Sequence, residues 1–132
     1  MAGSIAAEAL QLSITGNIEG ALGLLREARS NGPLDESALS LLFSLLHDRR
    51  PVDDEVTIIC AEGLALAVRP VSKSAWHLRR GLLLVDAEDG AGAAKDLLVV
   101  LKLRASDDHV SQANRALLAV AQLKKKKKPG PS

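Results

Sequence analysis

The chain has 132 residues, 17 of them basic and 16 acidic, which gives a net charge of +1 and a length typical of one domain. Leu and Ala make up 44 residues, while the aromatic residues are one Phe and one Trp, so helices are favoured over β-sandwiches and base-stacking surfaces. A single Cys excludes an internal disulfide framework and leaves no basis for a zinc knuckle.

Seven segments with apolar residues at helical spacing follow one another along the chain. The first two cover residues 5–15 and 18–30, and Gly16 and Asn17 between them are a helix-stop and turn signal. The third, residues 35–48, is apolar most of the way round, which predicts that it is buried between neighbours. The fourth begins in the acidic segment 53–55 and ends near Val68.

The second half of the chain predicts three more helices and a tail. The fifth helix follows Ser72 as N-cap and continues to Ala87, Gly90 precedes the sixth at 91–103, and the seventh occupies 107–123. Residues 124–132 hold five Lys and two Pro, which predicts a disordered tail behind a single helical domain over 1–123.

The helices also repeat in pairs. Gly16, the small Ala21 five positions later and the closing Pro33 resemble the turn and second helix of a tetratricopeptide repeat, and Gly90 with Ala93 begins a similar unit. Pro33 and Pro70 are 37 positions apart, and Pro70 and Ala105 are 35 apart, near the family period of about 34 residues.

This resemblance, over residues 3–105, implies an all-α, right-handed α-solenoid of about three helix pairs, with residues 107–123 as a C-terminal capping helix. The alternative is a generic α-helical bundle whose helices have similar lengths.

In such an array the first helix of each pair lines a concave face. The resemblance therefore implies a partner-binding groove formed by Leu10, Ile14, Leu39, Phe43, Leu46, His47, Leu78, Leu82 and Val85. An exposed groove this apolar would bind an amphipathic helix or an extended apolar segment of another protein. The same residues are alternatively core positions covered by the final helix.

Two groups of basic side chains are candidate electrostatic contacts. Arg79 and Arg80 would face an acidic partner or lie on a solvated helix surface. The tail residues Lys124, Lys125, Lys126, Lys127 and Lys128 would attract nucleic acid or an anionic membrane, or would act only as a solubilising tail.

Catalytic readings have little support in the sequence. Cys60 with His47, His77 or His109 would be the nucleophile and base, but Cys60 lies beside Ile58 and Ile59 within a predicted helix, as a buried inert thiol would. The His residues lack the i, i+4 spacing of a metal site, and no phosphate-binding loop is present in the sequence. We expect no enzyme activity, cofactor or metal.

The sequence thus predicts a cytoplasmic, non-catalytic adaptor that binds a segment of another protein. The chain lacks an apolar run of the roughly 18 residues that a membrane span needs, and its first residues do not resemble a secretory signal. The alternatives are a small secretion-type chaperone that masks an apolar segment, and a nucleic-acid or membrane-associated factor acting through the Lys tail. Homodimerisation through apolar faces of terminal helices stays open.

Overall fold

The computed structural model describes residues 4–49 and 54–127. These residues form helices without strands, which confirms the all-α prediction. The helices are α1 (Ile5–Ile14), α2 (Ile18–Asn31), α3 (Glu36–Arg49), α4 (Asp54–Leu66), α5 (Pro70–Asp86), α6 (Gly90–Leu103) and α7 (Asp107–Lys127). In the described part of the chain, no helix combines the length and apolar character needed to cross a bilayer.

Two helix boundaries differ from the sequence prediction by three or four residues, and the others differ by two at most. The expected cap at Ser72 is wrong, because α5 begins at Pro70 with Arg69 in the N-cap position. Proline suits a first helical turn, where its missing N–H would have no helical partner. Helix α7 continues four residues past Leu123, to Lys127, because Lys is a good helix former and its charge complements the negative helix C-terminus. The rest of the predicted disordered tail, residues 128–132, lies outside the described residues.

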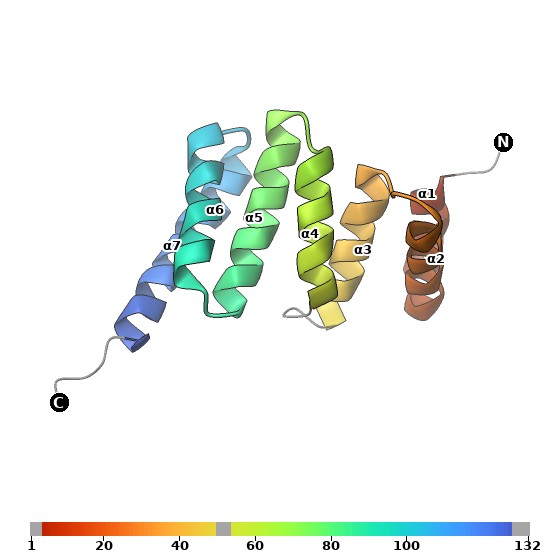
Figure 1. The fold of residues 1–132 in the computed structure, drawn as a ribbon, viewed down its shortest axis with the longest axis horizontal. Coiled ribbons are helices and arrows are strands. Elements are labelled where there is room, and N and C mark those ends of the chain that lie inside the picture. Colours follow the sequence, from red (N-terminus) through yellow and green to blue (C-terminus); the bar gives the residue numbers. More distant parts are fainter. Residues whose placement is uncertain (1–3, 50–53, 128–132) are drawn as a thin grey trace. The chain divides into compact units, whose positions relative to one another are not determined.

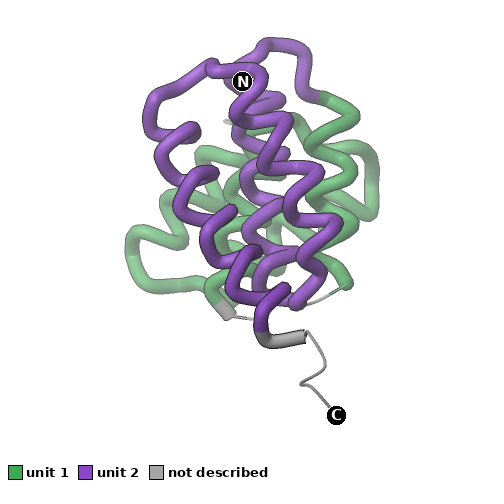
Figure 2. The backbone as a smooth tube through the Cα atoms, turned by 90° about the vertical axis from the view of Figure 1, so that its left-hand side faces the viewer, with its two compact units in different colours: residues 1–66 green, residues 67–132 purple. Residues whose placement is uncertain are grey.

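The chain divides into two compact units, residues 1–66 and 67–132, shown in different colours in Figure 2. Unit 1 contains α1 to α4, and unit 2 contains α5 to α7. In unit 1, α3 and α4 run side by side in opposite directions, and α5 and α6 do so in unit 2 (Figure 1). Helix α3 also packs against α1 and α2, and α7 packs against both α5 and α6.

The turn between α1 and α2 combines a left-handed residue with a side-chain cap. Gly16 has a φ of +91°, a conformation that glycine adopts without steric cost. The next residue, Asn17, accepts a hydrogen bond through Oδ1 from the Gly20 N–H at 2.9 Å, and its own N–H donates to the Leu12 carbonyl at 2.8 Å. Ala21 follows and is fully buried.

Unit 2 contains the same turn between α5 and α6. Glu88 has a φ of 60°, and Asp89 Oδ1 accepts a hydrogen bond from the Gly92 N–H at 3.0 Å. The Asp89 N–H donates to the Leu84 carbonyl at 2.8 Å, and Ala93 is fully buried. Asp89 lies 72 positions after Asn17, which is two periods of 36 residues.

The core of unit 1 is formed by small and branched side chains from all four helices. The prediction that the third helix is buried is confirmed, since Leu39 and Leu42 are at most 1% exposed. Two ion pairs join α2 to α4 at the surface, Arg26 to Glu55 at 2.8 Å and Arg29 to Glu62 at 2.9 Å.

Close packing of α5 on α6 defines the core of unit 2. A Cβ atom added to Gly81 would lie 2.8 Å from Cδ2 of Leu97, a fully buried side chain, so the two helices approach at a position that only glycine can occupy without displacement. The buried cluster around this contact consists of Leu78, Ala93, Leu97, Val100, Ala113, Ala116 and Val120.

Two Gly→Ala substitutions should therefore have opposite effects on stability. Gly81→Ala should lower the free energy of unfolding by about 1–3 kcal/mol, because the added methyl overpacks the contact with Leu97. Gly23→Ala, where the added Cβ has no atom within 4 Å, should raise it by about 0.5–1 kcal/mol through helix propensity. Urea unfolding followed by circular dichroism measures both, and equal effects of the same sign would contradict this packing.

Candidate functional site

Helix α1 exposes two large apolar side chains of the predicted groove. Leu10 is 48% exposed and Ile14 is 70% exposed. They are four positions apart in one helix and so lie one turn apart on the same side of α1. Unit 1 thus presents an apolar strip to solvent at its first helix.

The groove residues predicted on α3 are not exposed in the same way. Leu39, Phe43 and Leu46 are buried, and His47 is half-buried with its ring stacked on that of Phe43, the two centroids 5.3 Å apart. Helix α3 packs against α1, α2 and α4, and its nearly continuous apolar surface fills the space between them. These positions therefore belong to the core, as the alternative held, but the helices that cover them are α1, α2 and α4 and not the final helix that it named.

The remaining groove residues belong to unit 2. Leu78 is buried in the cluster around Gly81, and Leu82 and Val85 are partly buried against that cluster. The predicted set is thus divided between the two units, and Leu10 and Ile14 are its most exposed members.

A hollow of about 660 Å³ opens between α1 and α2, on another side of α1. Leu12 and Leu24 supply its apolar side chains, Gly20 and Gly23 leave backbone at its surface, and the polar lining residues are Glu8, Gln11 and Glu27. The sequence reasoning did not identify this hollow. Its one sequence signal is Gly23, an isolated glycine within a helix, which disfavours the helix and often marks a close approach.

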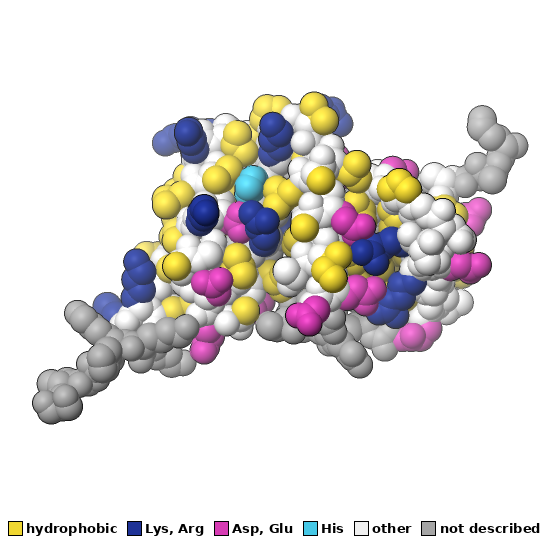
Figure 3. All heavy atoms as spheres, viewed as in Figure 1, with side chains coloured by type: hydrophobic (Ala, Val, Ile, Leu, Met, Phe, Trp, Pro, Cys, Tyr) yellow, Lys and Arg dark blue, Asp and Glu magenta, His cyan; other side chains and the backbone are white. Residues whose placement is uncertain are grey.

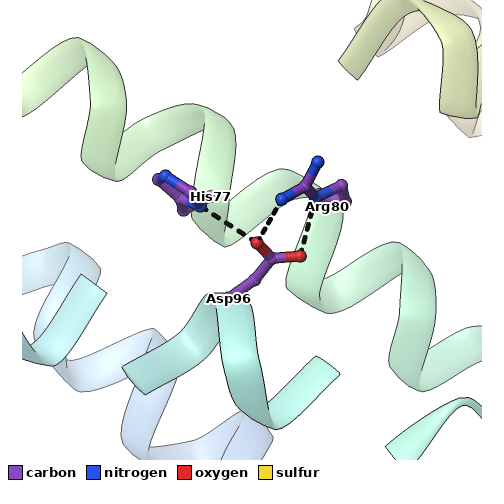
Figure 4. A network of polar contacts seen from close by, with 3 residues as sticks. All are labelled: His77, Arg80 and Asp96. Carbon is purple, nitrogen blue, oxygen red and sulfur yellow. Dashed lines mark hydrogen bonds and ion pairs between the residues drawn. The ribbon is translucent and has the colours of Figure 1, made fainter. Parts of the chain in front are cut away.

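A buried carboxylate joins α5 to α6 in unit 2 (Figure 4). Asp96 is 3% exposed, and Arg80 donates to it through two nitrogens, at 2.8 Å to Oδ2 and 2.7 Å to Oδ1. His77 Nδ1 lies 3.0 Å from Oδ1, and because a carboxylate only accepts, this ring nitrogen carries the proton. The paired geometry satisfies Asp96 and makes the network a structural link.

The pKa of Asp96 reflects these contacts. Burial by itself favours the neutral acid, but the hydrogen bonds from Arg80 and His77 and the attraction of their charges outweigh it. The pKa of Asp96 therefore lies below its ordinary value of 3.8, and the carboxylate is ionised at neutral pH.

A smaller hollow, of about 300 Å³, lies beside this network. Its lining residues are His77, Arg80, Leu84, Gly92, Lys95, Asp96 and Val99. The network occupies much of its surface, so the polar groups here are directed at one another as well as at solvent.

The basic residues singled out from the sequence have different surroundings. Arg80 binds Asp96, and the Arg79 guanidinium lies 4.4 Å from the ring centroid of Trp76, a cation–π contact. Lys124 and Lys125 are exposed on α7. The structure describes Lys126 and Lys127 only as part of that helix, and Lys128 lies outside the described residues.

The two units carry opposite charge. Residues 1–66 hold 4 basic and 10 acidic side chains, a net charge of −6, and residues 67–132 hold 13 basic and 6 acidic, a net charge of +7. Figure 3 shows basic side chains spread over α5 and α6. The nearly neutral total thus conceals an acidic unit and a basic unit.

The candidate catalytic residues Cys60 and His109 lie in the packed interior or contact a buried side chain. Cys60 is fully buried in α4, and His109 Nδ1 lies 2.9 Å from Oγ of the buried Ser74, which joins α7 to α5. Among residues 4–49 and 54–127, no three His, Cys, Asp or Glu side chains are grouped so that they could hold a metal ion.

Comparisons with protein-family models, curated proteins and solved structures give no match for this chain. Its function is therefore proposed from the local geometry described above.

Asp96→Asn should destabilise unit 2 by about 1–3 kcal/mol at pH 7, because the Arg80 guanidinium loses its charged partner. The folded-state pKa of Asp96 is lowered, so its contribution is present above the unfolded value near 3.8 and is lost as the pH falls through the folded value. Urea unfolding between pH 2 and 7 should show the difference from wild type shrinking below about pH 4. Asp48→Asn, at an exposed position of α3, is the control; a difference that persists unchanged at pH 2 would contradict this account.

Proposed function

We propose that the protein is a non-catalytic adaptor of the tetratricopeptide-repeat type, whose helix pairs stack as a solenoid and bind a segment of another protein. The pairs would be α1 with α2, α3 with α4, and α5 with α6, and α7 would cap the array. A scaffold of this kind offers extended side-chain surfaces.

The repeated turn supports the proposal that the helix pairs are repeats. Asn17 and Asp89 make equivalent caps, to Gly20 and Gly92, and each is followed by a fully buried alanine. The separation of 72 positions corresponds to two repeats of 36 residues, the mean of the two spacings between repeat ends in the sequence. The turn of the middle pair falls mostly in residues 50–53, outside the described residues.

The observation that carries the adaptor function is the exposure of Leu10 and Ile14 on α1. Two large apolar side chains one turn apart form the kind of strip onto which an amphipathic helix or an extended apolar segment docks. Burying a side chain of this size contributes about 1.5–3 kcal/mol, enough to change affinity tenfold or more.

Site-specific crosslinking tests this proposal in cells that contain the natural partner. A photo-crosslinking amino acid at position 14 should give a defined protein adduct, identified by mass spectrometry. The matched control is position 58, because Ile58 is 51% exposed on α4 of the same unit. In a pull-down without the crosslinking amino acid, Leu10→Ser combined with Ile14→Ser should reduce recovery of the protein identified in the adduct about tenfold or more. The same adduct at positions 14 and 58, or full recovery with the double variant, would contradict the proposal.

A further inference from the structure

The two hollows occupy equivalent places in their helix pairs. A shift of 72 positions places Leu12 of the α1–α2 hollow on Leu84 of the α5–α6 hollow, and Gly20 on Gly92. The same shift places four more lining residues, Glu8, Gly23, Leu24 and Glu27, on Arg80, Lys95, Asp96 and Val99, while Gln11 falls on Leu83, outside the second hollow. The two helix pairs therefore have a hollow at the same place, lined by residues of different chemistry.

In unit 2 the chain fills this position with its own charged side chains. Arg80 reaches from α5 to Asp96 on α6, and its guanidinium forms two hydrogen bonds there (Figure 4). Lys95 adds a long side chain at the same edge, and the space left is about 300 Å³. A guanidinium group beside apolar side chains is thus compatible with this position of the pair.

In unit 1 the same position is open and its charge is reversed. Glu8 stands where unit 2 has Arg80, and Leu24 stands where unit 2 has Asp96, so no ion pair crosses from α1 to α2 here. Neither Glu8 nor Glu27 forms an ion pair with any other described residue. The hollow therefore presents two uncompensated carboxylates beside the apolar Leu12 and Leu24.

Gly23 lines the hollow without a packing role in unit 1. Its equivalent in unit 2 is Lys95, and a Cβ atom at position 23 would meet nothing within 4 Å, so the packing of unit 1 does not require glycine. Gly20 is different, because a Cβ there would lie 2.5 Å from Nδ2 of the capping Asn17. A helix-weakening residue without a packing role fits a surface that another backbone or side chain approaches closely.

We infer that the α1–α2 hollow binds a basic amphipathic helix of a partner protein. The partner's apolar side chain lies over Gly23 between Leu12 and Leu24, and its Arg or Lys side chains pair with Glu8 and Glu27. The partner supplies from outside the cationic group that Arg80 supplies from inside unit 2. The inference rests on the proposed protein-binding function and names the partner chemistry for a second surface of α1, separate from Leu10 and Ile14.

Nuclear magnetic resonance of the full 15N-labelled chain tests the inference with defined peptides. The probe is a synthetic amphipathic helical peptide of Leu and Lys, and the matched control has Glu at every Lys position. The Leu–Lys peptide should shift the amide signals of Gly20 and Gly23, and its affinity should fall as salt is raised. Equal binding of the Leu–Glu peptide, or shifts that avoid α1 and α2, would overturn the inference.

Variants of the hollow locate the binding. Gly23→Lys introduces the residue that unit 2 has and should weaken the Leu–Lys peptide at least tenfold by filling the hollow and repelling the peptide. Glu8→Gln with Glu27→Gln keeps the shape and should weaken binding several-fold, while Asp48→Asn should leave it unchanged. Circular dichroism checks that each variant is folded, and the isosteric Gln pair decides the outcome if Gly23→Lys is not.

Two further results separate this inference from its alternatives. Sedimentation without peptide should show a monomer at all concentrations, since a mass that rises with concentration and falls in Gly23→Lys would assign the hollow to a second copy and overturn the inference. Crosslinks from position 14 that survive Gly23→Lys would uphold the adaptor function independently of the hollow. Several-fold weaker peptide binding in the Gln pair, with no crosslink at position 14, would uphold the hollow alone.

Discussion

The capped turn between paired helices is the constraint on which much of the structure depends. Asn17 and Asp89 each accept a hydrogen bond from the N–H three residues later, and this cap sets where the second helix begins. The capping side chain leaves no room for a Cβ on Gly20 or Gly92, and a fully buried alanine follows each. Small residues at these places let the two helices approach closely, and a hollow lies beside each of the two turns.

The α1–α2 pair and the α5–α6 pair have the same turn, but different side chains lie between their helices. In unit 2 a buried Asp96 accepts two hydrogen bonds from Arg80, and the resulting link replaces an open surface with an internal contact. In unit 1 the equivalent residues are Leu24 and Glu8, which cannot form such a link. A repeated backbone arrangement thus provides one cationic position, which an internal ion pair partly fills, and one larger, anionic hollow.

The net charge of the chain is also divided between the two units. The sequence total of +1 is nearly neutral, but the boundary at residue 66 separates a unit of net charge −6 from a unit of net charge +7. The Lys run accounts for most of the excess in unit 2, and its first four residues continue α7 as helix.

Helix positions, turn residues and repeat spacing follow from the sequence, because caps and helical periodicity act within a few residues. Gly16, Asn17 and Asp89 signal their turns for this reason. Contacts between helices were decided only in the tertiary structure. The apolar residues of α3 surround the helix, so periodicity could not predict which of them face a groove. The structure places Leu39 and Phe43 in the core. Nor could it pair Asp96 with Arg80, since the burial of a charge depends on a partner that another helix brings within reach.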